Sequence, residues 1–504
     1  MIRSLAFALA GAVCALAQTP CESLKTLSLP NTTVTAAEAV AAGPYRAPGQ
    51  AEAGAPRGLG LQMPAYCRVA AVIKPAPDSD IRIEVWLPAA DWNGKFQAVG
   101  NGGWAGVISF AAMAQAVVDH YATASTDTGH MGGDASFTLG HPDKVIDFAY
   151  RAVHEMTVQS KKIVEAYYGR EPRLSYWNGC STGGRQGLME AQRYPADFDG
   201  IIAGAPANYH LHLHAAQMEL ETSILKNKEA FLGQAQRALL NQAVMQACDA
   251  LDGVKDGLLE DPHKCHFDPA ALACKDGQTA GCLTAPQIAT AKRIYAGART
   301  KEGKLIFPGL EEGGELGWRN IGAGTEPAAI SMGSFRYLTF QDPNWDWRTF
   351  DLDRDTALAD QKAGFIDAVD PDLQPFRDRG GKLLLYHGWS DQGISPENTI
   401  NYYSEVIEKL GPNEDGPNGG AWIRLFMVPG MQHCGGGPGP NQFNMIGAME
   451  RWREEGRAPQ QILAEHVTNN RVDMTRPLCP YPQTAQYSGV GSTNDAANFV
   501  CKAQ

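Results

Sequence analysis

The sequence predicts an α/β fold in which one large insertion interrupts a parallel or mixed sheet. Short strand patterns alternate with helical ones along most of the chain. A serine lies in a glycine-rich turn between such a strand and a helix, and an aspartate and a histidine follow the last two predicted strands. With 504 residues, 44% of them hydrophobic and 19% charged, the chain can bury a large core.

The strands are predicted from short apolar runs that end in turn residues. Residues 81–87 largely alternate apolar and polar side chains, as a half-buried strand does, and Pro88 closes the run. Further strands are expected at 96–99, 121–125, 174–177, 200–203, 382–386 and 422–428. Helical spacing of apolar residues predicts a helix over 148–168, and a second helix follows the glycine-rich turn through Ala191.

The pattern changes between about residues 206 and 375. This block has a helical segment, then cysteine-rich loops, then glycine- and tryptophan-rich loops. We interpret it as an insertion rather than as more sheet. The predicted organisation is a catalytic domain made of residues 18–205 and 376–504, with residues 206–375 inserted between its two parts.

Residues 1–17 have the parts of a secretory signal peptide: one positive charge at Arg3, an apolar stretch, and Ala15-Leu16-Ala17 at the end. Cys14 allows a lipoprotein interpretation, but Val13 precedes it where a small residue is wanted. No other window reaches about 18 unbroken apolar residues. We therefore expect a secreted or periplasmic protein that does not span a membrane.

The cysteine count agrees with an oxidising compartment. The chain has 11 cysteines, and removal of Cys14 leaves an even set of 10, which suits five disulfides. Cys248/Cys265 and Cys274/Cys282 are natural local pairs, although the spacing leaves the connectivity open. Buried thiols or a zinc site are the alternatives, and no pair has the C-x-x-C spacing that structural zinc favours.

The net charge and its distribution indicate whether the protein is expected to bind nucleic acid. The formal net charge is −12, and no run of lysine and arginine exceeds two residues. A protein that binds nucleic acid would be expected to carry a basic patch or stripe. Nucleic acid is therefore not an expected partner.

Ser181 is the predicted nucleophile. Gly179-Cys180-Ser181-Thr182-Gly183 fits the G-x-S-x-G pattern, in which glycines flank a serine on a strained strand-to-helix turn. The predicted strand 174–177 precedes the turn, and a helix-compatible segment follows it. The alternative is an ordinary serine in a glycine turn.

A serine hydroxyl needs a base, and the base needs an orienting acid. Asp391 lies just past the predicted strand 382–386, and His433 lies on the loop after the strand 422–428. The order Ser…Asp…His is that of the α/β-hydrolase fold, so we predict this fold with a large inserted domain. His387 is the nearest rival to His433, but it precedes the acid, and we expect it to have a structural role.

The oxyanion formed during ester cleavage needs preorganised donors. The backbone N–H of Thr182, next after the nucleophile, is one candidate. The second is the N–H of Gly103, in the glycine-rich segment Gly100-Asn101-Gly102-Gly103 that follows the strand 96–99. The alternative is that this segment is a simple turn.

Longer motifs along nearly the whole mature chain resemble one family. They are residues 29–33 (Leu-Pro-Asn-Thr-Thr), 64–69 (Pro-Ala-Tyr-Cys-Arg-Val), 100–103 (Gly-Asn-Gly-Gly), 125–130 (Ser-Thr-Asp-Thr-Gly-His), 179–187 (Gly-Cys-Ser-Thr-Gly-Gly-Arg-Gln-Gly), 204–208 (Gly-Ala-Pro-Ala-Asn), 387–391 (His-Gly-Trp-Ser-Asp), 478–482 (Leu-Cys-Pro-Tyr-Pro) and 494–501 (Asn-Asp-Ala-Ala-Asn-Phe-Val-Cys). With these motifs the chain resembles the tannase/feruloyl esterase family, which includes mono(2-hydroxyethyl) terephthalate hydrolases.

The resemblance implies a secreted α/β-hydrolase whose insertion is a lid. The family's CS-D-HC arrangement falls on Cys180-Ser181, Asp391 and His433-Cys434. The disulfides implied in the same way are Cys21–Cys67, Cys180–Cys434, Cys248–Cys265, Cys274–Cys282 and Cys479–Cys501.

The resemblance also implies a structural calcium ion in the lid. Its ligands would be the carboxylates of Asp249, Asp252 and Asp256 and the backbone carbonyls of Val254 and Leu258. Hard Ca²⁺ prefers oxygen ligands, and the glycines of this segment permit tight turning. The aspartate spacing could instead mark one solvated helix face, but two glycines make a continuous helix costly.

Two further features of the insertion leave alternatives open. His210, His212 and His214 suggest zinc, but no acid or histidine follows at a matching spacing. Several aromatic residues could stack on a planar acyl group or pack the insertion's own core. They are Trp318, Phe335, Tyr337, Trp345, Trp347 and Phe350.

We therefore expect a serine carboxylesterase that acts on esters of aromatic acids such as feruloyl esters. The substrate would be a small aromatic ester or an ester of a plant polysaccharide or polyphenol. Galloyl esters (a tannase) and terephthalate monoesters are the alternative substrates. A non-catalytic binding protein with the same fold and a metal-dependent hydrolase are the alternative classes, and the sequence leaves the oligomeric state open.

Overall fold

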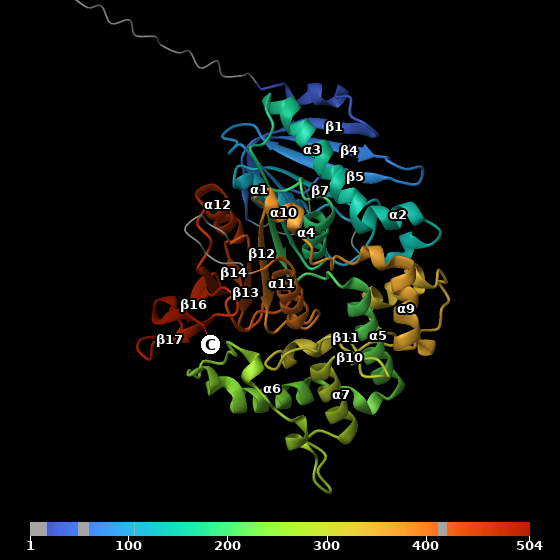
Figure 1. The fold of residues 1–504 in the computed structure, drawn as a ribbon, viewed down its shortest axis with the longest axis vertical. Helices are drawn as coiled ribbons and strands as arrows, with labels where there is room; N and C mark the ends of the chain where they lie inside the picture. The colour runs from blue at the N-terminus through green and yellow to red at the C-terminus, as the bar shows by residue number, and fades with distance from the viewer. Residues whose placement is uncertain (1–17, 49–59, 105, 412–420, 504) are drawn as a thin grey trace, which may run out of the picture.

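The computed structural model describes residues 18–48, 60–104, 106–411 and 421–503. The predicted signal peptide, residues 1–17 with Cys14, lies outside the described residues. Figure 1 shows a central sheet covered by helices, with the inserted segment beside one end of it.

A nine-stranded sheet has the order β1-β4-β5-β7-β6-β8-β9-β12-β13. Its strands are β1 (Thr32–Val40), β4 (Tyr66–Ile73), β5 (Ile81–Pro88), β6 (Lys95–Val99), β7 (Ala122–Thr126), β8 (Leu174–Cys180), β9 (Gly200–Gly204), β12 (Lys382–Gly388) and β13 (Ile423–Val428). The pairs from β7 to β13 are parallel, whereas β1, β4, β5 and β7 pair antiparallel. The predicted strands are thus present, and β1 and β4 extend the sheet beyond them.

Helices cover both faces of this sheet. One face packs against α3 (Ala152–Tyr168), α4 (Thr182–Arg193), α10 (Gln374–Asp378) and α11 (Pro396–Leu410). The other face packs against α1 (Phe110–Val118) and α12 (Met445–Glu455). The strands β6, β9 and β13 are buried throughout, and β12 is mostly so, as expected for parallel strands between two helical layers. In β8 the first part of the strand is buried, at residues 175–177, and its end at the turn is partly exposed. The predicted α/β-hydrolase fold is confirmed.

The chain leaves the sheet after β9 and returns to it at β12. Between them lie α5 (His210–Lys226), α6 (Gln234–Cys248), α7 (Ala285–Ala296), β10 (Ala298–Arg299), β11 (Leu305–Phe307), α8 (Ala329–Gly333) and α9 (Leu352–Ala363). This segment is more helical than the sequence suggested, because α7 and α9 lie where loops were expected. Ala368 and Leu373 already pack in the core beside the sheet, so the chain rejoins that core before residue 375.

Small sheets complete the molecule. They are formed by β2 (Gly43–Pro44) with β3 (Gln62–Met63), by β10 with β11, by β14 (Gln442–Phe443), β15 (Ile462–Thr468) and β16 (Arg471–Leu478), and by β17 (Thr484–Tyr487) with β18 (Phe499–Lys502). In Figure 1 the C-terminal strands lie close to the loop after α6. Arg476 on β16 pairs with Asp256 at 2.6 Å, which ties this end of the chain to the inserted segment.

Five disulfides are present. They are Cys21–Cys67, Cys180–Cys434, Cys248–Cys265, Cys274–Cys282 and Cys479–Cys501, the same pairs that the resemblance implies. Such a set is typical of proteins that fold in an oxidising compartment. Within the described ranges, every helix is too short or too polar to cross a lipid bilayer.

Candidate active site

Ser181 lies on a strained turn between β8 and α4. Its backbone has φ 64° and ψ −124°, a conformation that side-chain-bearing residues rarely adopt. The turn is also tightly packed, since a Cβ on Gly179 would lie 2.5 Å from the carbonyl oxygen of Gly183. The glycines of the motif are therefore required by space, and the turn presents the serine at the carboxyl end of the parallel strands.

Ser181, His433 and Asp391 lie in one hydrogen-bonded line. His433 Nε2 is 2.9 Å from Ser181 Oγ, and His433 Nδ1 is 2.7 Å from Asp391 Oδ2. Because a carboxylate only accepts, Nδ1 carries the proton, and Nε2 is left to accept from the serine hydroxyl. This is the arrangement of a serine nucleophile, its general base and an orienting acid.

Asp391 is held by more donors than the sequence indicated. His387 Nε2 also donates to Asp391 Oδ2, at 3.0 Å, and His387 Nδ1 accepts from the hydroxyl of Thr399 at 2.7 Å. The backbone N–H groups of Gly393 and Ile394 donate to Oδ1 at 2.8 and 2.9 Å. His387 is completely buried, so it lies behind the acid rather than at the nucleophile.

The surroundings of Asp391 and His433 shift their pKa values in opposite directions. Burial raises the pKa of Asp391, but the charge of His433 and the hydrogen bonds from His387 and His433 outweigh it and hold the pKa below its usual value. Burial lowers the pKa of His433, but the charge and hydrogen bond of Asp391 raise it above its usual value. The acid therefore stays ionised and strengthens the histidine as a base.

The two predicted oxyanion donors lie on adjoining segments. The Oγ1 of Thr182 donates to the carbonyl oxygen of Gly103 at 2.9 Å, which joins the start of α4 to the loop after β6. Gly103 has φ 57°, a left-handed conformation that glycine adopts at little cost. The loop is anchored before it as well, because Asn101 Nδ2 donates to Thr126 O at 2.8 Å.

The Cys180–Cys434 disulfide joins the residues next to the nucleophile and the base. Its Cα atoms are 6.0 Å apart, and it spans 254 residues of chain. The bond lies between the end of β8 and the loop after β13. It therefore restricts how far Ser181 and His433 can separate.

Comparison with known proteins gives one family. A profile described as tannase and feruloyl esterase matches residues 67–502. The chain belongs to this family. It is accordingly a carboxylic ester hydrolase, and the alternative of a non-catalytic binding protein is set aside.

Similar proteins of the family come from bacteria and fungi. An uncharacterized esterase of Xanthomonas campestris pv. campestris is 37% identical over 99% of this chain and 94% of its own. Feruloyl esterase C of Talaromyces stipitatus is 34% identical, over 95% and 94% of the two chains. The crystal structure of feruloyl esterase B from Aspergillus oryzae superimposes with a TM-score of 0.88 at 32% identity, covering 96% of this chain and 99% of that one.

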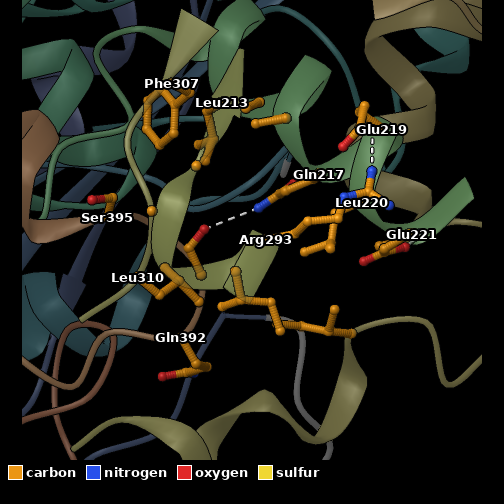
Figure 2. Close-up of a pocket in the computed structure, with 18 of the residues that line it drawn as sticks. Leu213, Gln217, Glu219, Leu220, Glu221, Arg293, Phe307, Leu310, Gln392 and Ser395 are labelled. Atoms are coloured by element: carbon orange, nitrogen blue, oxygen red, sulfur yellow. Dashed lines mark hydrogen bonds and ion pairs between the residues drawn. The ribbon is translucent and has the colours of Figure 1, made fainter. Parts of the chain in front are cut away.

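In this member of the tannase and feruloyl esterase family, a cavity of about 280 Å³ lies between the inserted segment and the loop that carries Asp391 (Figure 2). Among the described residues, its lining includes Gln392 and Gly393, which lie next to His433, but not Ser181, Asp391 or His433 themselves. Gln392 Oε1 accepts from the backbone N–H of His433 at 3.3 Å, and a Cβ on Gly393 would lie 3.9 Å from His433 Cγ. Its walls include the apolar side chains Leu213, Leu220, Ile294, Phe307, Leu310 and Ile330.

The cavity also presents polar groups. Gln217 Nε2 donates to the carbonyl oxygen of Gly393 at 2.9 Å, and Arg293 pairs with Glu219, as Figure 2 shows. Burial raises the pKa of Glu221, on the same wall, to about 7, although the backbone N–H of Ala328 donates to it. A mostly apolar space with a few fixed polar groups is typical of a small-molecule site.

The aromatic residues of the insertion, for which acyl contact and core packing were both open, pack away from this cavity. Trp345 packs with Phe335, Phe340 and Phe350 inside the inserted segment, and Trp318 packs against Tyr295. Among the residues that the structure describes, the cavity lining includes Phe307 and none of Trp318, Phe335, Tyr337, Trp345, Trp347 and Phe350. Of the two alternatives, the structure favours packing of the insertion's own core.

The turn proposed to hold calcium contains an excess of buried negative charge. Burial raises the pKa of Asp252, and the charges of Asp256 and Asp249 raise it further. Burial also raises the pKa of the neighbouring Glu260 to about 7. Arg476 lies against Asp256 at 2.6 Å and 3.8 Å from Glu260. The donor set is one of hard oxygens with too little positive charge, which fits a divalent cation.

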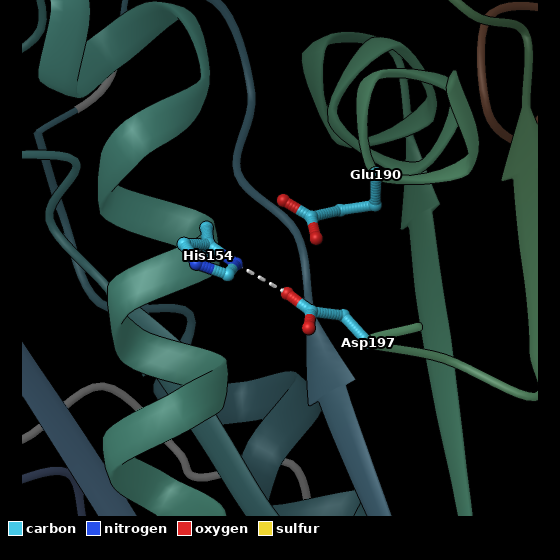
Figure 3. A group of neighbouring side chains, drawn as sticks. All are labelled: His154, Glu190 and Asp197. Carbon is cyan, nitrogen blue, oxygen red and sulfur yellow. Dashed lines mark hydrogen bonds and ion pairs between the residues drawn. The ribbon is translucent and has the colours of Figure 1, made fainter. Parts of the chain in front are cut away.

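His154, Glu190 and Asp197 form a second group that could hold a metal ion (Figure 3). In the described part of the chain, this is the one group of three ligand-type side chains whose ligand atoms all lie within 4.8 Å of one another, so the aspartates of the calcium turn are not gathered as tightly. Burial, followed by the charge of Asp197, raises the pKa of Glu190 well above its usual value. A proton on Glu190, in place of a metal ion, would therefore account for the close approach of Glu190 to Asp197.

The three histidines at the start of α5 do not form one cluster, because the rings of His210 and His214 meet with centroids 4.2 Å apart while His212 lies elsewhere. His212 Nε2 lies 3.0 Å from Asp360, whereas His214 Nδ1 lies 2.7 Å from Ser334 Oγ on a different side of the helix. His210 packs edge-on against Trp104. Their positions explain why alternate residues of a helix make a poor metal site.

Proposed function

We propose that this esterase hydrolyses esters of aromatic acids, such as feruloyl esters, through an acyl-enzyme on Ser181. The observation that carries the proposal is the line from Ser181 Oγ through His433 to Asp391, with distances of 2.9 and 2.7 Å. This geometry supplies a nucleophile, a base of raised pKa and an ionised acid.

In the proposed mechanism, His433 Nε2 takes the proton of Ser181 as Oγ attacks the ester carbonyl. The developing oxyanion accepts from the backbone N–H groups of Gly103 and Thr182. His433 then gives the proton to the leaving alcohol, and the same residue activates the water that hydrolyses the acyl-enzyme. Asp391 holds the tautomer of the imidazole and stabilises its charged form.

The choice of an aromatic acyl group has two supports. The cavity beside His433 is mostly apolar and about 280 Å³ in volume, which suits a planar acyl group. Two of the similar proteins are named feruloyl esterase B and feruloyl esterase C. Galloyl esters and terephthalate monoesters remain the alternative substrates, because the same apolar walls could accept either ring.

We extend the proposal to the rest of the chain. Residues 206–375 would act as a lid that walls the cavity, and 18–205 with 376–504 would form the catalytic domain. Asp249, Asp252 and Asp256, with the carbonyls of Val254 and Leu258, would hold a structural Ca²⁺, which neutralises the buried charge of that turn. The five disulfides support a secreted or periplasmic location.

A substrate comparison tests this function. Methyl ferulate, methyl gallate and a terephthalate monoester are compared by kcat/KM on one preparation, with Ser181→Ala as the control. We expect the highest kcat/KM for methyl ferulate and loss of all three activities in Ser181→Ala. A preference for a short aliphatic ester over all three would contradict the aromatic assignment, and full turnover by Ser181→Ala would contradict the mechanism.

A further inference from the structure

Trp104 belongs to the loop after β6 and packs in a hydrophobic cluster that the inserted segment shares with Ala135 and Phe148. It directly follows Gly103, and only 2% of its surface is exposed. It lies in one hydrophobic cluster with Leu211, Met332 and Phe335 of the insertion. Its ring stacks on Phe148 and meets the edge of His210, with ring centroids 4.8 Å apart in both pairs. The loop that carries Gly103 therefore contacts the inserted segment through this side chain.

The polar groups around Trp104 hold this loop from three directions. The indole Nε1–H donates to the carbonyl oxygen of Ile330 at 2.8 Å. His130 Nε2 lies 2.7 Å from the carbonyl oxygen of Trp104, and burial lowers the pKa of His130, so a neutral ring donates here. Together with the bond from Thr182 to Gly103, these contacts fix the two carbonyl groups that follow the Gly103 N–H.

Ile330 connects this contact to the substrate cavity. The residue lines the cavity, and its Cδ1 would lie 3.4 Å from a Cβ on Gly103. The short helix that contains it also lies tightly on the indole. A Cβ on Gly333 would be 3.1 Å from Trp104 Nε1 and 2.8 Å from the Cβ of Ala135. There is little room for this helix to move without moving Trp104.

We propose that Trp104 is a positioning residue. It couples the placement of the Gly103 N–H, which donates to the oxyanion, to the placement of the inserted segment. The inference rests on the proposed function, since it assigns the oxyanion role to Gly103. The same indole that places the donor also fixes the carbonyl of a cavity-lining residue. The substrate wall and the oxyanion loop are thus joined by one hydrogen bond, and a displaced wall weakens stabilisation of the transition state.

The first test is Trp104→Phe, which keeps an aromatic ring and removes the Nε1–H. Loss of a whole oxyanion donor costs about 10²–10³ in kcat, and a displaced donor should cost less, about tenfold. We expect kcat for p-nitrophenyl acetate and for methyl ferulate to fall by about tenfold. Inhibition by an aryl trifluoromethyl ketone, whose adduct carries the oxyanion, should weaken by a similar factor. Binding of the free aromatic acid should change much less.

Three further variants separate positioning from stability. Trp452→Phe is the matched control, because Trp452 is a buried tryptophan on the opposite face of the sheet, and it should keep the wild-type kcat. Incorporation of 3-benzothienylalanine at position 104 replaces the N–H with sulfur at nearly the same shape, and should reproduce the loss even if Trp104→Phe folds poorly. Gly333→Ala should lower kcat in the same direction.

The outcomes are distinguishable from failure of the proposed function. If Ser181→Ala is inactive while the benzothienylalanine variant has wild-type kcat and wild-type affinity for the ketone, the positioning role of Trp104 is overturned and the serine mechanism stands. Equal loss of ketone and acid binding would also overturn it, because it would show general damage to the pocket. If Ser181→Ala is fully active, the proposed function itself fails.

Discussion

Cys180 and Cys434 are joined by a disulfide, and their chain neighbours Ser181 and His433 approach to 2.9 Å between Oγ and Nε2. The covalent bond and the catalytic hydrogen bond therefore lie side by side. Both the disulfide and the hydrogen bond join the end of β8 to the loop after β13. The disulfide limits the separation of nucleophile and base independently of the rest of the fold.

Removal of this disulfide should reduce turnover as well as stability. In Cys180→Ser/Cys434→Ser we expect several-fold lower kcat, because the His433 loop gains freedom. The free energy of unfolding should fall by about 2–4 kcal/mol. The measurements are kcat at a temperature well below Tm, and Tm itself. The double variant Cys274→Ser/Cys282→Ser, which opens a bridge between residues only 8 apart, is the control and should keep full kcat. Full kcat in the first variant would restrict the Cys180–Cys434 bond to a stabilising role.

Replacement of His387 should weaken the triad without destroying it. In His387→Asn, Asp391 loses one donor, its pKa rises, and kcat/KM should fall by about tenfold, equal to about 1.4 kcal/mol. His433→Asn should instead lose several orders of magnitude. Thr399→Val, which removes only the hydroxyl behind His387, should have a smaller effect than His387→Asn. Equal losses in the His387 and His433 variants would mean that the base is wrongly assigned.

The pH dependence should report the raised pKa of His433. The base works only when it is neutral, so kcat/KM should fall as the pH drops through this pKa and level off above it. The midpoint should lie above the ordinary histidine value of about 6.5. In Asp391→Asn the midpoint should move to lower pH, because the charge that raises the pKa is removed, and kcat should fall by on the order of 10⁴. If the midpoint did not change in Asp391→Asn, the contact between Asp391 and His433 would not be the cause of the raised pKa of His433.

Removal of metal should lower stability and leave chemistry intact. EDTA, or Asp252→Asn, is expected to lower Tm by about 5 °C and to remove one bound calcium measured by mass spectrometry of metals. Asp276→Asn, an exposed residue of the same segment, is the control. Turnover measured well below Tm should not change. Loss of turnover with the fold intact would favour a metal-dependent hydrolase instead.

The strands around the triad could be predicted because parallel strands between two helical layers are continuous apolar runs. Residues 423–428 and 382–388 follow this rule. The helix α7 was not predicted, although Thr284 and Gln287 form a capping box at its start, because the helix is short and buries only Thr290, Ala291 and Ile294. The strand β1 was not predicted because Thr32–Val40 is an edge strand in which only Val34 is buried, so its small apolar residues show no clear alternation.

Contacts between distant segments could not be predicted in the same way. The sequence cannot show whether Trp345 lines a cavity or packs against Phe340, since both need an apolar surface. Nor could it show that His387 donates to the same oxygen of Asp391 as His433, because that depends on the path of the loop between them. The approach of Ser181, His433 and Asp391 to one another could be predicted, because all three follow strand ends on one edge of the sheet.

Covalent labelling of Ser181 tests the central claim most directly. The enzyme is treated with an alkyl fluorophosphonate, and peptides are examined by mass spectrometry while residual turnover of methyl ferulate is followed. We expect one adduct per chain, on the peptide that contains Ser181, with turnover lost in proportion and no adduct in Ser181→Ala. An adduct on another residue that accounts for the lost turnover, or complete labelling of Ser181 with turnover retained, would contradict the account.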